Sequence, residues 1–385
     1  MKRARGFSLV ELMIAVTLGL LLIGAASAIF VGARNGYTAT TSVSAQSDSA
    51  RFSTDFLARA LRSSGYIGCV QAPLAVDNFQ NHTVIDAFAL SGTGGNIIAG
   101  YEASSTNPGQ TYTLPATFAG DNTAADWTPN LPSGATYGLL GTAVGNAVQG
   151  SDVLVTYGTV NQPAVTVTSI GSTTVTVSLP SGYATLDQLF PAGTVAIISN
   201  CAVANAFQVT AVSNGTNTVT HAANSTMTMG NASATLSLTF NAGAFLYVPT
   251  TSFYYIGLGS DGDAALFKSD LTLGSGGTGT YTMVATELVP DVENMQVLYG
   301  VKSTATGSVV EYVRGDQVTA TCSDGTWNCV ANVSVALLVS SPTGAVPVPS
   351  SAPTYSLLGT SITAPKDTRQ RTVYQITAAL RNSLP

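Results

Sequence analysis

The fold is decided by a stretch near the N-terminus, which reads Arg5-Gly6-Phe7-Ser8-Leu9-Val10-Glu11-Leu12-Met13-Ile14. Three basic residues precede Phe7, and Glu11 is the one charged residue between Phe7 and Ala33. This apolar run is long enough to cross a bilayer, which takes about 20 residues of helix. Because positive flanks stay on the cytoplasmic side, we expect the body of the protein to lie outside the cytoplasm.

Glu11 is the unusual residue of this run. A carboxylate within a membrane segment costs about 2.5–3.5 kcal/mol on insertion scales, and such residues are usually kept for a partner. One alternative is that Glu11 lies near the membrane interface, where this cost falls. Another is an ordinary signal peptide, since Ala26-Ser27-Ala28 has the form of a signal-peptidase site. That interpretation predicts a mature chain starting at Ile29 and gives Glu11 no role.

Composition limits the class of protein. The 385 residues suffice for one large or two ordinary domains. Charged residues make up 9% of the chain and hydrophobic residues 45%, which is typical of secreted β-rich proteins rather than of cytosolic enzymes. The net charge is −6 and no basic run follows the N-terminus, so the sequence predicts no nucleic-acid partner.

The N-terminal segment as a whole predicts one long helix. No proline occurs before Pro73, and we expect the helix to run from about Leu9 to about Arg62, with Gly65 as its stop. Gly32 or Gly36 is its predicted weak point. The spacing of apolar and small residues in its second half predicts a buried face made of Val43, Phe52, Phe56, Ala60 and Ser63.

Beyond Gly65 the pattern changes to alternating β-branched runs separated by Gly, Asn, Ser and Pro clusters, which predict strands and turns. The runs cover residues 153–157, 164–168, 174–178, 194–198, 235–240 and 333–338. The second and third are joined through Gly171 and predict a hairpin. Residues 91–150 show weak periodicity and predict long loops or an irregular insertion. The fold class is therefore α+β, with a long N-terminal helix packed on a mostly antiparallel β-rich head.

Few residues are candidates for chemistry. His82 and Asp86 lie close in the sequence, but no G-x-S-x-G elbow accompanies them. We therefore interpret both histidines, His82 and His221, as solvated loop residues. Asp261-Gly262-Asp263 lacks the spacing of a calcium loop and predicts a β-turn.

Asp291 and Glu293 are the remaining pair of neighbouring carboxylates. No pocket residues surround them in the sequence, so we interpret them as part of a solvated face or a subunit contact rather than as an acid and a base. We predict no catalytic, cofactor-binding or metal-binding residues and no enzymatic activity.

The chain has four cysteines, in no C-x-x-C spacing. An even number in an exported protein favours disulfides. Cys322 and Cys329 enclose a turn-like loop that a disulfide can close. Four cysteines allow three connectivities, and the alternatives stay open. A four-thiolate zinc site is less favoured, since it usually takes paired ligands at short spacing.

The stretch from Arg5 to Glu11 resembles the type III signal of type IV prepilins. The resemblance implies that a membrane-embedded prepilin peptidase cuts between Gly6 and Phe7 and methylates the new amine of Phe7. It also implies that Glu11 pairs with the N-terminal amine of a neighbouring subunit. Physical chemistry agrees, because an unpaired carboxylate and an unpaired ammonium are both costly in a low dielectric.

Several stretches of the head are similar to PilW-type minor pilins. They are residues 64–69, 150–154, 199–201, 265–268, 287–300 and 371–382. Cys69 and Cys201 lie in two of them, and the resemblance implies that these two cysteines pair. Residues 91–149 and 205–235 resemble nothing in that subgroup, so their role is not predicted.

The resemblance also implies a function and a layout. Proteins of this subgroup are low-abundance subunits that help start pilus assembly and form a tip complex with other minor pilins and a large tip adhesin, next to the major pilin. The expected layout is a leader at 1–6, a membrane half of the helix at 7–33, an amphipathic half at 34–64 and a head at 65–385. Before assembly the protein is expected in the bacterial inner membrane with a periplasmic head, and afterwards at the cell surface. The alternatives are a minor pseudopilin of type II secretion and a conventionally secreted β-rich binding protein.

Overall fold

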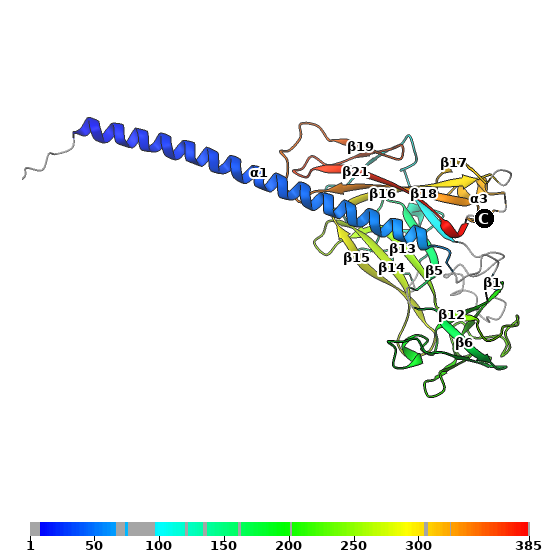
Figure 1. The fold of residues 1–385 in the computed structure, drawn as a ribbon. Helices are drawn as coiled ribbons and strands as arrows, with labels where there is room; N and C mark the ends of the chain where they lie inside the picture. The colour runs from blue at the N-terminus through cyan, green and yellow to red at the C-terminus, as the bar shows by residue number, and fades with distance from the viewer. Residues whose placement is uncertain are drawn as a thin grey trace, which may run out of the picture.

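A computed structural model describes residues 8–66, 74–75, 97–119, 122–133, 137–160, 163–200, 202–303, 307–323 and 325–383. One long helix, α1 (Leu9–Ser63), projects from a β-rich head and lies across it with its second half (Figure 1). The α+β fold class predicted from the sequence is confirmed. The helix continues through Gly32 and Gly36, so neither glycine breaks it.

The end of α1 follows the predicted stop signal. Ser64 leaves the helical region, and Gly65 adopts a φ of +74°, the left-handed conformation that glycine takes at low cost. The amide of Gly65 donates a hydrogen bond of 2.7 Å to the carbonyl oxygen of Tyr157. The helix therefore ends where the chain joins the first described sheet of the head.

The predicted buried face of α1 is wrong. Val43, Phe52 and Phe56 are 44%, 57% and 42% exposed. The side chains that are buried in the second half of α1 are Ser42, Gln46, Ala50, Ser53, Leu57 and Leu61. Small residues on this face let the helix approach the sheet closely, and the two leucines fill the core. Apolar spacing alone favoured the neighbouring flank because that flank carries the two aromatic side chains.

The strands form four sheets. The six-stranded sheet has the order β15-β14-β13-β5-β2-β4, and the four-stranded sheet has the order β17-β16-β18-β21. Strands of the first are β2 (Ile98–Ala103), β4 (Trp127–Thr128), β5 (Val153–Thr159), β13 (Pro249–Leu258), β14 (Ala264–Leu273) and β15 (Tyr281–Pro290). Strands of the second are β16 (Val292–Lys302), β17 (Val309–Val313), β18 (Val330–Ser340) and β21 (Arg371–Ala379).

The other two sheets lie at the periphery. The eight-stranded one, β1-β9-β8-β12-β6-β7-β11-β10, lies at the bottom of Figure 1, and the three-stranded one has the order β19-β20-β3. The first contains β1 (Leu74–Ala75), β6 (Val165–Ile170), β7 (Thr174–Val177), β8 (Val195–Ser199), β9 (Ala204–Gln208), β10 (Ala211–Ser213), β11 (Thr218–Thr220) and β12 (Phe245–Tyr247). The second contains β3 (Thr111–Thr113), β19 (Thr354–Leu357) and β20 (Thr360–Thr363).

Short helices complete the described secondary structure. They are η2 (Ala124–Asp126), η3 (Leu186–Gln188), α3 (Val318–Thr321) and η4 (Arg381–Ser383). Most of the strand predictions are confirmed, including the antiparallel hairpin of β6 and β7. Residues 235–240 are an exception, since they form no strand. The prediction of an irregular region at 91–150 holds in part, because β2 within it pairs with β5 as an inner strand of the six-stranded sheet.

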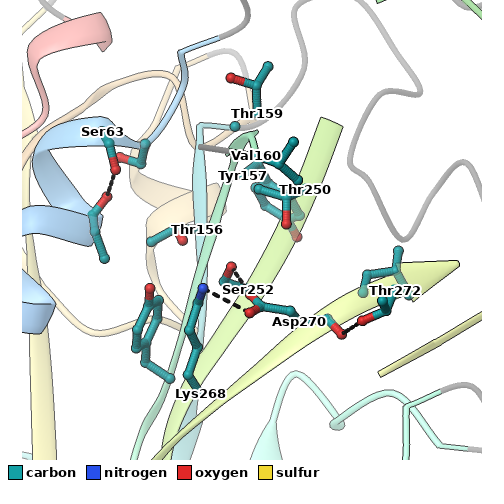
Figure 2. Close-up of a pocket in the computed structure, with 15 residues that line it drawn as sticks. Ser63, Thr156, Tyr157, Thr159, Val160, Thr250, Ser252, Lys268, Asp270 and Thr272 are labelled. Carbon is teal, nitrogen blue, oxygen red and sulfur yellow. Dashed lines mark hydrogen bonds and ion pairs between the residues drawn. The ribbon is translucent and has the colours of Figure 1, made fainter. Parts of the chain in front are cut away.

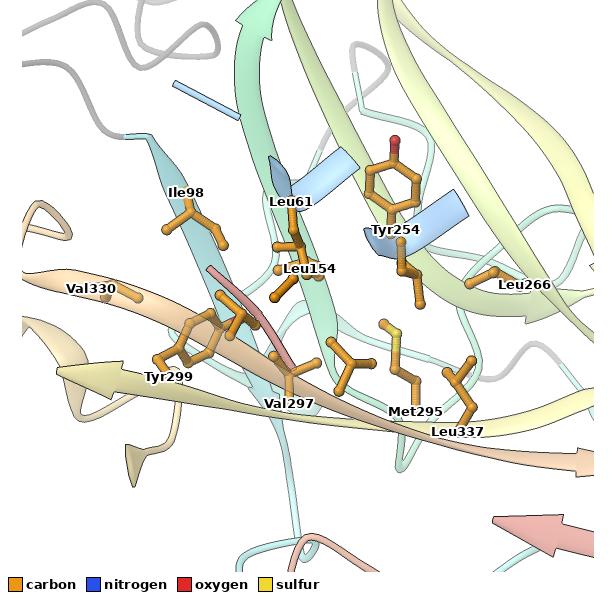
Figure 3. Close-up of a cluster of buried hydrophobic side chains, with 14 of the residues drawn as sticks. Leu61, Ile98, Leu154, Tyr254, Leu266, Met295, Val297, Tyr299, Val330 and Leu337 are labelled. Atoms are coloured by element: carbon orange, nitrogen blue, oxygen red, sulfur yellow. The ribbon is translucent and has the colours of Figure 1, made fainter. Parts of the chain in front are cut away.

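The main core lies between α1 and the two central sheets. Leu61 of α1 meets Leu154, Tyr254 and Leu266 from the six-stranded sheet, as Figure 3 shows. Met295, Val297, Tyr299 and Leu337 come from the four-stranded sheet. A second buried apolar cluster packs against the eight-stranded sheet and contains Phe190, Phe207 and Leu246. The helix is thus packed on the middle of the head, and the eight-stranded sheet has a core of its own.

Candidate functional site

The N-terminal half of α1 packs against no other described part of the chain. From Leu9 to Tyr37 nearly every side chain is exposed, and the helix is long and apolar enough to cross a membrane. A contiguous apolar surface of this size marks a membrane or protein contact. This half of the helix is therefore the first part of the candidate site.

Glu11 lies in the first turn of α1, where the helix dipole favours a negative charge. The helix begins after Ser8, whose carbonyl oxygen accepts a hydrogen bond of 3.1 Å from the amide of Leu12. Within the part of the chain that the structure describes, the Glu11 carboxylate has no ion-pair partner. Gly6 and Phe7 lie outside the described residues, so the predicted cleavage site and its amine are not placed.

The second half of α1 is held to the head by hydrogen bonds as well as by apolar contacts. The side-chain amide of Gln46 donates to the carbonyl oxygens of Val339 at 2.7 Å and Gln370 at 3.1 Å. At the other end, the side-chain amide of Asn382 donates to the carbonyl oxygen of Ser64 at 2.7 Å. These hydrogen bonds fix both ends of the head-bound half of α1 to the head.

A polar cavity of about 460 Å³ lies beside the end of α1, between the helix and strands β5, β13 and β14 (Figure 2). Its charged residues neutralise each other, since Lys268 Nζ lies 2.8 Å from Asp270 Oδ2. The hydroxyl of Ser252 donates to Asp270 Oδ1 at 2.5 Å. The cavity lining contains no histidine or cysteine.

Glu293 does not lie on a solvated face, so that part of the interpretation is wrong, whereas Asp291 is half-buried and the alternative of a subunit contact stays a prediction. Glu293 is 3% exposed and forms a two-pronged ion pair with Arg371, with distances of 2.6 and 3.0 Å. Asp291 lies 3.0 Å from Arg369, which also contacts Asp263. Both arginines lie 78 residues away along the chain, so no local pattern could reveal these pairs. Both carboxylates are therefore held in ion pairs within the head.

The segment around Asp261 forms the predicted turn. It connects β13 to β14, and the amide of Gly262 donates to the carbonyl oxygen of Gly259 at 3.1 Å. Asp263 follows the turn and contacts Arg369. No group of three or more histidine, cysteine or acidic side chains that could hold a metal ion occurs among the described residues.

Sequence reasoning missed a second buried acidic pair. Glu102 and Asp152 are 4% and 3% exposed and stand opposite each other where β2 meets the start of β5. The Asp152 carboxylate accepts hydrogen bonds from the amides of Ala103 at 2.9 Å and Val297 at 2.8 Å. Burial raises the pKa of both carboxyls, to about 9 for Glu102 and about 7 for Asp152, and the Asp152 charge raises that of Glu102 further. Because amides bond both oxygens of Asp152, Glu102 is the one that holds the proton. Asp152 lies in the stretch 150–154 that resembled minor pilins, which was the one available signal.

Two cysteines of the four are placed. Cys322 and Cys329 form a disulfide with a Cα–Cα distance of 5.8 Å. Trp327, inside the loop it closes, packs edge-to-face on Tyr299 with ring centroids 4.8 Å apart. The loop is thereby fixed to the core. Cys69 and Cys201 lie outside the described residues, and their predicted pairing stays a prediction.

His221 is not a solvated loop residue, so that interpretation is wrong. It is fully buried and packs against Phe207 with ring centroids 5.2 Å apart. Both ring nitrogens lack a hydrogen-bond partner within the described part of the chain. Burial lowers the pKa of the imidazole, so the neutral form is favoured. His82 and Asp86 lie outside the described residues.

Comparison with known protein families gives two matches. Residues 1–27 match the model of the prokaryotic N-terminal methylation motif, and residues 253–382 match that of the type IV pilus-assembly protein W family. Comparisons with curated proteins and with solved structures give no significant match. The first match covers the residues before α1 and its exposed start, and the second begins within β13 and runs through β21. The chain thus combines a prepilin-type N-terminus with a region of a pilus assembly family, which confirms its resemblance to type IV minor pilins.

Proposed function

We propose that this chain is a minor type IV pilin, a non-enzymatic subunit that helps start pilus assembly and joins a tip complex with other minor pilins and a large tip adhesin. The exposed apolar part of α1 from Leu9 to Ala33, in which Glu11 is the one charged residue, is the observation that carries the proposal. The methylation motif at residues 1–27 supports the same role.

In this proposal prepilin peptidase cuts between Gly6 and Phe7 and methylates the amine of Phe7. Before assembly the mature helix lies in the inner membrane with the head in the periplasm. During assembly the Glu11 carboxylate pairs with the N-terminal ammonium of a neighbouring subunit. Each group would be costly alone in the low dielectric, so pairing lowers the free energy of the assembled state. After assembly the protein lies at the cell surface.

The test compares Glu11→Ala with Asp48→Ala, which removes an exposed carboxylate from the head-bound half of the same helix. We expect both variants to be cleaved and to accumulate normally. Glu11→Ala lowers the amount in sheared surface pili at least about tenfold, since the unpaired ammonium costs a few kcal/mol. Asp48→Ala is incorporated like the parent chain. Normal incorporation of Glu11→Ala would rule out the pairing.

Two further experiments separate this proposal from a conventionally secreted protein and from a minor pseudopilin. The intact mass of the mature chain gives its first residue: N-methylated Phe7 is expected, whereas a start at Ile29 contradicts the proposal and indicates a conventional signal peptide. Deletion of the gene is expected to reduce surface pili. Normal pili with blocked export of secreted enzymes would instead identify a minor pseudopilin.

A further inference from the structure

The edges of the sheets differ in length. Most edge strands are short, which limits pairing with other chains. These short edges are β1 and β4 with two residues, β3 and β10 with three, β19 with four and β17 with five. β21 has nine residues, but α1 packs along it. β15 has ten residues and forms the other edge of the six-stranded sheet; α1 also approaches it, less extensively than β21, and leaves Thr282 and residues 284–287 exposed.

Within residues 282–289 of β15, half of the backbone groups have no partner among the described residues. The strand pairs with β14 alone, from Ala265 opposite Pro290 to Leu273 opposite Tyr281. In an antiparallel pair every second residue directs its amide and carbonyl to the neighbouring strand, and the others point outward. For residues 282–289 no described residue bonds these outward groups. The edge is therefore a template for another strand.

The middle of β15 lacks the features that usually protect an edge. The sequence Thr282-Met283-Val284-Ala285-Thr286 has no charge, no proline and no glycine, and Val284 is 51% exposed. Protection begins only beyond it, with Glu287, a bulge and Pro290. The unprotected segment is about 17 Å long at 3.4 Å per residue.

An exposed aromatic flank of α1 lies on the same side of this sheet. Phe52 and Phe56 continue the row of Ala60 and Ser63 at helical spacing. Ala60 and Ser63 line the polar cavity together with Asp270 of β14, so this flank faces the sheet (Figure 2).

Val284 provides the link between the helix flank and the open edge. It stands directly opposite Asp270, and side chains of opposed residues lie on one face of a sheet. Val284 therefore points to the side of α1, where Phe52 and Phe56 are 57% and 42% exposed. An apolar surface and a row of free hydrogen-bonding groups thus meet along β15.

We propose that β15 receives an extended strand from another subunit of the pilus assembly, which adds to the six-stranded sheet and packs its alternate apolar side chains beside Phe52 and Phe56. This inference rests on the proposed function and names its partner surface. The free backbone groups require an extended polypeptide rather than a helix or a small molecule. The uncharged edge favours a segment without charges on its inner face, because an unpaired charge there would be costly.

The test measures hydrogen exchange of the segment 281–290 by mass spectrometry. The mature full-length chain in detergent micelles is compared with the same chain in sheared pili that have been enriched through an affinity tag. In micelles we expect about half of the amides to exchange fast, since only half bond to β14. In pili these fast amides slow at least 100-fold, because a new strand bonds them.

Unchanged exchange of residues 282–286 in pili would overturn the proposal. Protection of these amides already in micelles, if it increases with protein concentration, would also overturn the proposal. A second copy of this chain would then occupy the edge. Failure of the proposed function has a different outcome: the chain is then missing from sheared pili, and no exchange comparison is reached.

A pair of variants adds a second measurement. Val284→Lys places a charge on the open edge, and Val310→Lys places one on β17, the edge strand of the four-stranded sheet, where Val310 is 61% exposed. We expect both chains to accumulate and resist protease like the parent chain. Val284→Lys lowers the amount in pili at least about tenfold, whereas Val310→Lys leaves it unchanged. Equal amounts of the two variants in pili would contradict the assignment of β15.

Discussion

Two regions of the head bury polar groups in different ways. The seam region consists of α1 and strands β13 to β18 with β21, and it buries charges that meet across long stretches of sequence, such as Glu293 with Arg371. The distal lobe consists of residues 163–247, and the side chains that it buries are neutral, such as Asn205, Gln208 and His221. The match to the pilus assembly family covers the head strands of the seam region and starts beyond the distal lobe.

The buried ion pairs of the seam region explain how α1 is held on the head. Buried ion pairs are costly to break because each leaves an uncompensated charge, so they fix one arrangement of the elements that carry them. Arg371 begins β21, which packs along α1, and Glu293 lies in β16 at the centre of the four-stranded sheet. The distal lobe makes no such pairs within its described residues and packs instead through its own apolar cluster. The stability of the seam region therefore depends on a few residues, whereas the stability of the lobe depends on many small contacts.

The largest effect is expected from Arg371→Met. The variant leaves Glu293 buried without a partner and also releases Asp367, so the free energy of unfolding falls by about 3–5 kcal/mol. Denaturant unfolding of the mature chain in micelles, followed by tryptophan fluorescence, measures the loss.

Arg59→Met is the control for Arg371→Met. Its ion pair with Asp55 is as short, at 2.6 Å, but the two side chains are 75% and 51% exposed. The expected loss is below about 1 kcal/mol. Similar losses in the two variants would show that burial of charge does not distinguish the seam region.

The sequence predicted the elements better than their contacts. The extent of α1, its stop at Gly65 and most of the strands follow from local spacing, which a sequence displays directly. The partners of Glu293 and Asp291 could not be predicted, because Arg371 and Arg369 reach them only after the sheet has formed. His221 was misread for the same reason, since the pairing of β11 with β7 brings it beneath the lobe surface. Glu11 was found because one charge in an apolar run is itself a local signal.

A second prediction concerns rising pH and Glu102, which lies on β2 of the six-stranded sheet, beside the seam region. Burial raises the pKa of Glu102, with Asp152 as the next contribution. A group with a raised pKa in the fold stabilises it fully below the pKa of the unfolded chain, near 4.5, and loses this contribution as the pH rises. Each pH unit between about 5 and 8 therefore costs at most about 1.4 kcal/mol.

Glu102→Gln measures this dependence, because the amide is close in shape and does not ionise. We expect the variant to lose less stability than the parent chain between pH 5 and pH 8, and the loss that remains in the variant comes from Asp152, whose pKa burial also raises. Identical slopes for both chains would contradict a protonated Glu102.

The smallest effect is expected in the distal lobe, and it has the opposite sign. Burial lowers the pKa of His221, so the neutral ring contributes stability that is present above the pKa of the unfolded chain, near 6.5, and is lost as the pH falls. The loss is about 1 kcal/mol for each pH unit below that value, up to the size of the shift.

Hydrogen exchange of residues 204–221 between pH 7 and pH 5 measures this loss locally. His221→Phe removes the ionisable group and keeps a ring beside Phe207, so opening of the lobe should then become independent of pH in this range. Equal opening of the lobe at pH 7 and pH 5 in the parent chain would contradict a pH dependence set by His221. A loss of stability of the seam region in acid, without one in the lobe, would contradict the assignment for both regions.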